Sequence, residues 1–282
     1  MSLADIAAQH GLHRVGARPK LGKYLKETWG RRDFIVALAQ FRLQSDLSEN
    51  RLGILWLVLR PMLNAAVYGL IFGVIQGSSR GADYPATVVT GVFLFEYFSS
   101  SLSRGAKSVT GNRSLVQSLA FPRLTLPIAE VIEGFFSLLP SLIVLAILLP
   151  VLGHWPTWNW LLMIPLLAIF TLFNAGVAMF VARLTVHVQD LTQFLPFVTR
   201  ILFYTSGVLF NVDTIFKDHP WVLQLYDFHP IYQVLKIART VLMGGTQTYD
   251  PMYWWYFAAW AAVAFVGGLL FFWVAEERYG RD

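Results

Sequence analysis

Four ionisable residues lie within stretches that are otherwise apolar, and their side chains are the ones most able to do chemistry. Glu130 and Glu133 are three residues apart, so a helix places them on one face. Glu96 and Arg200 each lie in the middle of a different apolar stretch. A charge in hydrocarbon is costly, and such residues usually pair with one another or take part in transport. We expect an ion pair between Arg200 and one of the glutamates, and a proton relay is the alternative.

Other reactive arrangements are missing from the sequence. The segment most similar to a phosphate-binding loop is Gly16 to Lys23. Its glycine spacing differs from that of the motif, and Tyr24 follows where Ser or Thr is needed. The six histidines are scattered, and no metal-ligand spacing occurs. The absence of cysteine excludes disulfides and thiol chemistry. We therefore predict a chain with no catalytic residues, no metal site and no cofactor of its own.

The composition indicates an all-α integral membrane protein. Hydrophobic residues make up 56% of the chain and charged residues 14%, whereas a soluble domain has about 25% charged residues. The mean hydropathy is +0.53. The first thirty residues contain no apolar core of a signal peptide, so we expect none to be cleaved.

Long charge-poor stretches predict six transmembrane helices, since each needs about 20 mostly apolar residues. The charge-free stretch from Gly134 to Ala182 is too long for one helix, and it is interpreted as a hairpin that turns at Gly153 to Pro156. The six predicted spans are 53–79, 84–103, 125–152, 157–182, 191–212 and 251–275.

Lys and Arg gather on one side of these spans, which places both termini in the cytoplasm. The same distribution places the 104–123 loop in the cytoplasm and residues 211–250 outside. Tryptophans near the predicted outer interface agree with this orientation, because Trp favours membrane–water boundaries. They are Trp155, Trp158, Trp160, Trp254 and Trp255.

Outside the six-span domain of residues 53–275, we predict two cytoplasmic tails and one interfacial helix. Residues 1–22 and 276–282 are the tails. Across 23–48, apolar and basic side chains alternate at helical spacing, from Tyr24 to Leu47, which predicts an amphipathic helix in the cytoplasmic interface. This helix either anchors the membrane only or has a further role.

Two connections have unusual patterns. Residues 111–127 form a short basic segment whose apolar and polar positions fit a short amphipathic helix, broken at Pro122. An ordinary cytoplasmic loop is the alternative. Residues 213–242 hold two apolar clusters, each too short to span a membrane and separated at His229-Pro230. They predict two short re-entrant helices between the fifth and sixth spans, and a pair of helices lying on the outer surface is the alternative.

The amino-acid sequence of residues 52–61 and 111–127 resembles that of permease subunits of type-2 ABC exporters. These exporters move polysaccharides such as O-antigens, teichoic acids and cell-wall galactans. The resemblance is strongest at 52–76, 90–127 and 190–242. It departs at His229-Pro230, where relatives often have Asn-Pro, and at Ser206-Gly207, where they often have Ser-Pro.

The resemblance implies a homodimer in the inner or plasma membrane, bound to two copies of a separate ABC ATPase that holds ATP and Mg. The substrate would be a glycan on polyprenyl diphosphate, and no nucleic acid would be involved. The residues that would contact the ATPase are Asn112, Arg113, Leu115, Val116, Leu119, Phe121, Pro122 and Arg123. Those that would form an external gate are Trp221, Tyr226, His229, Pro230, Tyr232 and Leu235.

Two further sets of residues follow from such a substrate. An anionic lipid headgroup would arrive near the start of the first span, at Arg42, Arg51 and Arg60, although these arginines also fit simple anchoring. Sugars bind to aromatic faces, so a glycan pathway is expected to use Phe95, Tyr97, Phe98, Phe203 and Tyr204. The competing function is a stand-alone secondary transporter or channel for a small solute. A lipid-sugar enzyme would need an acidic or metal motif in a long loop, and the sequence has none.

Overall fold

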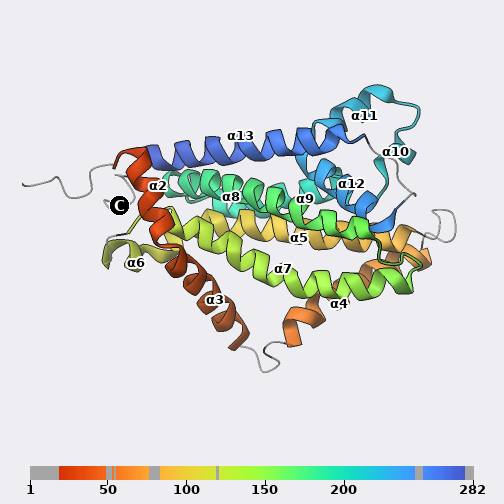
Figure 1. Ribbon diagram of the computed structural model, residues 1–282, viewed down its shortest axis with the longest axis horizontal. Helices are drawn as coiled ribbons and strands as arrows, with labels where there is room; N and C mark the ends of the chain where they lie inside the picture. The colour runs from red at the N-terminus through yellow and green to blue at the C-terminus, as the bar shows by residue number, and fades with distance from the viewer. Residues whose placement is uncertain are drawn as a thin grey trace, which may run out of the picture.

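The computed structural model describes residues 19–48, 53, 55–75, 83–118, 121–244 and 250–276, and every regular element in this part of the chain is a helix. Long helices lie side by side, with α2 and α6 at one end and α10, α11 and α12 at the other (Figure 1). We call these the α6 end and the α11 end. In chain order the elements are α2 (Leu21–Gly30), α3 (Arg32–Ser48), α4 (Leu55–Ile75), α5 (Tyr84–Lys107), η2 (Thr110–Asn112), α6 (Arg113–Ser118), α7 (Thr125–Val151), η3 (Trp158–Leu162), α8 (Met163–His187), α9 (Leu191–Thr205), α10 (Val212–Ile215), α11 (Pro220–Asp227), α12 (Pro230–Met243) and α13 (Met252–Val274).

Helices form in all six stretches that were predicted to span a membrane. Among the described residues, three helices are long and apolar enough to cross a membrane: α7, α8 together with η3, and α13. The predicted hairpin between α7 and α8 turns at Gly153, whose φ of 94° lies in the left-handed region that favours glycine. The all-helical class is thus confirmed, and the count of six spans stays a prediction.

The fifth helix is shorter than predicted. The expected span was 191–212, but α9 ends at Thr205 and contains 15 residues, about 22 Å of helix. The chain turns at Gly207, which has a φ of 71°, and a Cβ there would lie 2.8 Å from Val212 Cγ2. Glycine at this position therefore allows the chain to turn after α9 and to pack closely on Val212, at the start of α10.

The predicted helix over 23–48 is two consecutive helices, so the prediction of one continuous element is wrong. The interruption is at Arg31, whose N–H donates to the carbonyl oxygens of Glu27 and Thr28. Gly30 precedes the break, and glycine is a poor helix former. Both helices bury a face in the protein, at Tyr24 in α2 and at Ile35 and Ala39 in α3.

The two short helices predicted in the segment at the α11 end are present as α11 and α12, and α10 is an additional single turn that precedes them. α12 packs against α5, α8 and α13, and nearly all of its side chains are buried. It is an internal part of the bundle, although the depth of this segment in a membrane stays a prediction.

The backbones of α8 and α13 approach each other closely at two glycines. A Cβ on Gly176 would lie 2.3 Å from the backbone carbon of Ala264, and one on Gly268 would lie 2.1 Å from the backbone oxygen of Gly176. Small residues allow helix backbones to touch, which is how helices gain packing energy inside a membrane. α8 and α13 therefore depend on glycine at this crossing.

Gly268→Ala is expected to separate α8 from α13 and to lower the free energy of unfolding by about 1–3 kcal/mol, the usual cost of overpacking. Gly267→Ala is the matched control, because nothing lies within 4 Å of a Cβ at that position. Thermal unfolding of the purified protein in detergent measures both. Equal midpoints for the two variants would contradict the tight crossing.

Candidate functional site

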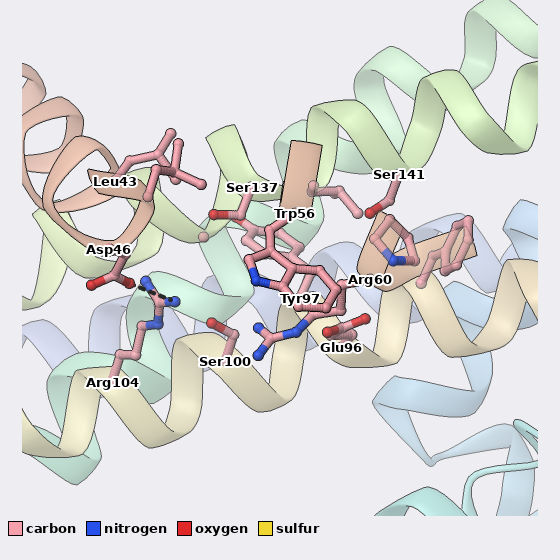
Figure 2. A pocket seen from close by; sticks show the side chains of 15 residues that line it. Leu43, Asp46, Trp56, Arg60, Glu96, Tyr97, Ser100, Arg104, Ser137 and Ser141 are labelled. Carbon is pink, nitrogen blue, oxygen red and sulfur yellow. Dashed lines mark ion pairs between the residues drawn. The ribbon is translucent and has the colours of Figure 1, made fainter. Parts of the chain in front are cut away.

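A polar cavity of about 470 Å³ lies between α3, α4, α5 and α7. Figure 2 shows Ser137 and Ser141 pointing into it from α7, and Glu96 and Ser100 from α5. Trp56 of α4 lies across the middle of the cavity in this view. The four helices thus bring polar side chains together in a bundle whose core is otherwise mostly apolar.

Helical spacing explains why these side chains share one cavity. On α5 the residues that line it are Phe93, Glu96, Tyr97, Ser100 and Arg104. They recur every three or four positions, so they share one face of the helix. Gly134, Ser137, Leu138 and Ser141 repeat the pattern on α7. The sequence therefore sets the polar faces, but only the packing of α5 on α7 makes them meet.

Two ion pairs to glutamates of α7 lie near the cavity, and Arg104 of one of them lines it. Arg104 of α5 pairs with Glu133 of α7, and its Nη2 lies 3.5 Å from Oδ2 of Asp46 in α3. Arg42 of α3 pairs with Glu130 of α7. Both glutamate side chains are largely buried, with exposures of 11% for Glu130 and 2% for Glu133. The two pairs fasten α3 and α5 to α7.

The expectation that Arg200 pairs with a glutamate is wrong for the described residues. Arg200 is exposed on α9 and forms no ion pair within the described part of the chain. Glu96 instead lies within electrostatic reach of Arg60 and is hydrogen bonded by Asn64 of α4. Arg42 of α3 and Arg104 of α5 reach the glutamates of α7 because both helices pack against α7. Arg60 reaches Glu96 because α4 packs against α5.

The three arginines expected to receive a lipid headgroup differ in their surroundings. Arg42 is held in its pair with Glu130, with 16% of its side chain exposed. Arg60 is exposed and faces Glu96 across the cavity. Arg51 lies outside the described residues. The ion pair of Arg42 favours a bracing role for that residue, and the headgroup role of the arginines stays a prediction.

The segment expected to contact an ATPase forms η2 and α6, as its pattern predicted. Arg113 and Gln117 are exposed and Val116 is buried. Asn112 Nδ2 donates to the carbonyl oxygen of Ser108 at 2.7 Å. Leu115 is half-buried and Pro122 is buried. Leu119 lies outside the described residues.

The end of this segment is bonded to the first described helix and to the residue that follows the last one, in a cluster that sequence reasoning missed. Tyr24 Oη of α2 donates to Oε2 of Glu276 at 2.6 Å, and Leu124 N donates to Tyr24 Oη at 3.2 Å. The backbone N–H of Arg123 donates to Oε1 of Glu276 at 3.1 Å, and Arg123 Nη1 donates to the Glu276 carbonyl at 2.7 Å. We call Tyr24, Arg123, Leu124 and Glu276 the terminal cluster.

Burial raises the pKa of the Glu276 carboxyl above its usual value, while Tyr24 and Arg123 oppose the shift by hydrogen bonding and charge. Phe121, just before the terminal cluster, packs against Phe34 of α3 with ring centroids 5.7 Å apart. The 121–124 turn is therefore in contact with α2, α3 and the end of α13. No sequence signal pairs residues so distant along the chain.

The five aromatic residues expected along a glycan pathway separate into core and surface. Phe95, Tyr97 and Phe98 are at most 5% exposed, and Tyr97 and Phe98 pack against Phe170 and Phe173 of α8. These three are core residues of a single subunit, and only Tyr97 reaches the cavity. Tyr204 has 58% of its surface exposed, and Phe203 is half-buried against Phe95 at 5.2 Å.

The residues expected to form a gate also differ in exposure. Trp221 is exposed, Tyr226, His229 and Pro230 are half-buried, and Tyr232 and Leu235 are buried. His229 caps α12, since its Nδ1 accepts the N–H of Tyr232 at 3.2 Å. Burial lowers the pKa of His229, which keeps the imidazole neutral and able to accept this hydrogen bond.

A buried polar network holds α12 in place, and sequence reasoning missed it as well. Lys236 Nζ lies 3.0 Å from Oδ1 of Asp213 and donates to Tyr232 Oη at 3.1 Å. Arg239 donates to the carbonyl oxygen of Val208 at 2.8 Å. The signal in the sequence was two basic residues in an apolar run, but their partners lie in other elements. Across the described residues, no three potential metal ligands come together.

Replacing Arg104 should leave the buried Glu133 without a counter-charge, so Arg104→Met is expected to cost about 3 kcal/mol of folding free energy. The double variant Arg104→Met/Glu133→Gln should recover much of this loss, because it removes both charges. Lys23→Met is the control, since the Lys23–Glu27 pair is exposed and such pairs contribute little. Chemical denaturation of the detergent-solubilised protein measures all three. A double variant as unstable as Arg104→Met would contradict the pairing.

Comparison with known proteins gives the family. Residues 34–243 match the model of the ABC-2 type transporter family. The chain is 27% identical over 219 residues to an O-antigen export system permease protein, RfbA, of Klebsiella pneumoniae, covering 77% of this chain and 83% of the relative. It is 26% identical to the RfbA permease of Myxococcus xanthus, covering 68% and 74%. It is 21% identical to the polysialic acid transport protein KpsM of Escherichia coli, covering 75% and 81%. The match spans the cavity, the α6 segment and α12, and the chain belongs to the ABC-2 type transporter family.

Proposed function

We propose that this chain is the permease subunit of an exporter that moves a polysaccharide, linked to polyprenyl diphosphate, from the cytoplasm to the outer face of the cell membrane. The observation that carries the proposal is the similarity to O-antigen and polysialic acid permeases over about three quarters of the chain. Deleting the gene tests it. The surface glycan should be lost and lipid-linked glycan should accumulate inside. An unchanged surface glycan would reject the proposal.

Energy for export would come from a separate ABC ATPase, bound in two copies to a homodimer of this chain. α6 is the proposed contact, because it presents exposed polar residues at the end of the bundle that also carries α2 and the terminal cluster. A force on α6 would pass through the 121–124 turn. Tyr24 and Glu276 would then carry it to α2 and to the end of α13, since both bond directly to that turn.

The glycan would leave along the dimer interface, beneath the helices of the α11 end. α9 supports this placement, because it keeps an exposed aromatic and aliphatic face that includes Phe197, Ile201 and Tyr204. α12 is the proposed moving part of the gate. It is short, and its buried polar network could break and re-form as one unit.

Charge reversal on the exposed face of α6, with Arg113→Glu and Gln117→Glu, should weaken ATPase binding at least tenfold while the permease stays folded. These positions are preferable to Phe121, whose loss would also disturb packing on Phe34. Lys217→Glu at the α11 end is the control, since Lys217 is also exposed. Co-purification with the ATPase measures binding. Full binding by the α6 variant would mean that the ATPase docks elsewhere.

Cysteine labelling can follow α12, because the chain has no cysteine of its own. Leu235→Cys should be protected from a membrane-impermeant external reagent at rest, since Leu235 is fully buried, and it should become reactive during ATP turnover. Leu225→Cys is the control and should react in every state, because Leu225 is 67% exposed. Continued protection of position 235 during turnover would remove α12 from the gate.

A further inference from the structure

We propose that the polar cavity between α3, α4, α5 and α7 is a carbohydrate-binding site that holds a short segment of the exported glycan. The inference rests on the proposed function, because it takes a polysaccharide as the substrate. It adds a recognition site inside one subunit, away from α9 and the proposed dimer interface.

The charges of the cavity favour an uncharged ligand. Its charged lining consists of Arg60, Arg104, Asp46 and Glu96. Arg60 faces Glu96, and Arg104 lies 3.5 Å from Asp46 while it also pairs with Glu133. The lining thus holds two basic and two acidic residues, so its charges balance and give a diphosphate no advantage over an uncharged ligand. Balanced charges still supply both donors and acceptors of hydrogen bonds.

The remaining polar groups suit a polyhydroxylated molecule. Ser100, Ser137 and Ser141 face the cavity from two helices, as Figure 2 shows. A hydroxyl both donates and accepts, so it can bond to a sugar hydroxyl in either direction. Polar residues within a membrane bundle are costly and usually mark a substrate path. The three serines thus place hydroxyl groups from two helices beside the charged residues of one cavity.

Trp56 supplies the apolar part of the site. Its ring lies across the cavity, above Tyr97 and beside Arg60 and Glu96 (Figure 2), and it is 38% exposed. A large flat ring offers contact area with little loss of conformational entropy, and it fits the flat C–H face of a pyranose. Polar groups around such a ring would bond to the hydroxyls at the sugar's edge.

The size and position of the cavity agree with this assignment. Its volume of about 470 Å³ lies within the range of about 300–1,000 Å³ typical of small-ligand sites. It adjoins Asp46 and Leu47 at the end of α3, the helix that precedes the first predicted span. A glycan waiting on the cytoplasmic side would meet it before reaching the dimer interface.

Direct binding tests the site, with the full-length permease co-purified with its ATPase. The probes are methyl glycosides of glucose, galactose, mannose, rhamnose and N-acetylglucosamine, with inorganic pyrophosphate as the anionic comparison, detected by saturation-transfer difference NMR. At least one glycoside should bind saturably. Trp56→Ala and Ser137→Leu should each weaken it at least fivefold, and Trp56→Phe should retain it. Trp155→Ala is the control, because Trp155 is exposed in the turn after α7.

Two results would overturn the assignment. One is that no glycoside binds saturably, or that binding is the same in all variants with wild-type unfolding midpoints. The other is that pyrophosphate binds and is lost with Trp56→Ala, which would assign the cavity to a diphosphate headgroup. A parallel export assay separates the two proposals. If the wild-type gene restores surface glycan to a deletion strain, the proposed function stands whatever the binding result. If the deletion leaves surface glycan unchanged, the proposed function fails independently.

Discussion

The cost of placing charge in an apolar helix bundle governs the architecture around α7. Glu130 and Glu133 are buried, so each needs a counter-charge, and Arg42 and Arg104 supply it from α3 and α5. These pairs fix α3 against the bundle, although α3 lies outside the predicted spans. The Arg104–Glu133 pair also lies at the edge of the polar cavity, because Arg104 is one of its lining residues. The placement of α3 and that of the cavity wall at Arg104 thus depend on these two interactions.

The terminal cluster connects the turn after α6 with α2 and with the end of α13. Tyr24 comes from the first described helix, Glu276 follows the last, and the 121–124 turn lies between them in the sequence. Three of its four hydrogen bonds involve the Glu276 carboxylate or the Arg123 guanidinium, and such charge-assisted bonds are stronger than neutral ones. Movement of α6 would then reach α2 and α13 together instead of being absorbed by a loop.

The two ends of the molecule differ in kind. At the α6 end, short elements present exposed polar faces, which suits docking of another protein. At the α11 end, α12 is buried on nearly all sides and is held by Lys236, Asp213 and Arg239. A short buried helix held by such charged groups is expected to change position as a unit, because breaking one of these bonds exposes charge to an apolar core.

The sequence by itself determined the all-helical class, the approximate place of every long helix, the short helix over 113–118 and the helices of the α11 end. Those features follow from apolar run length, helical periodicity and Pro or Gly breaks, which are local properties. The apolar pattern identified Glu96, Glu130 and Glu133 as charged residues in apolar stretches, but the predicted partner, Arg200, was wrong. The predicted fifth span was also too long, because α9 ends before Gly207. Phe95, Tyr97 and Phe98 were expected along a glycan pathway, whereas the structure buries them in the core of one subunit. Only the tertiary structure decided which arginine meets which glutamate, which faces of α5 and α7 form the cavity, and how Tyr24 reaches Glu276. Those contacts join residues far apart in the chain, and the packing that brings them together is set by all the helices at once.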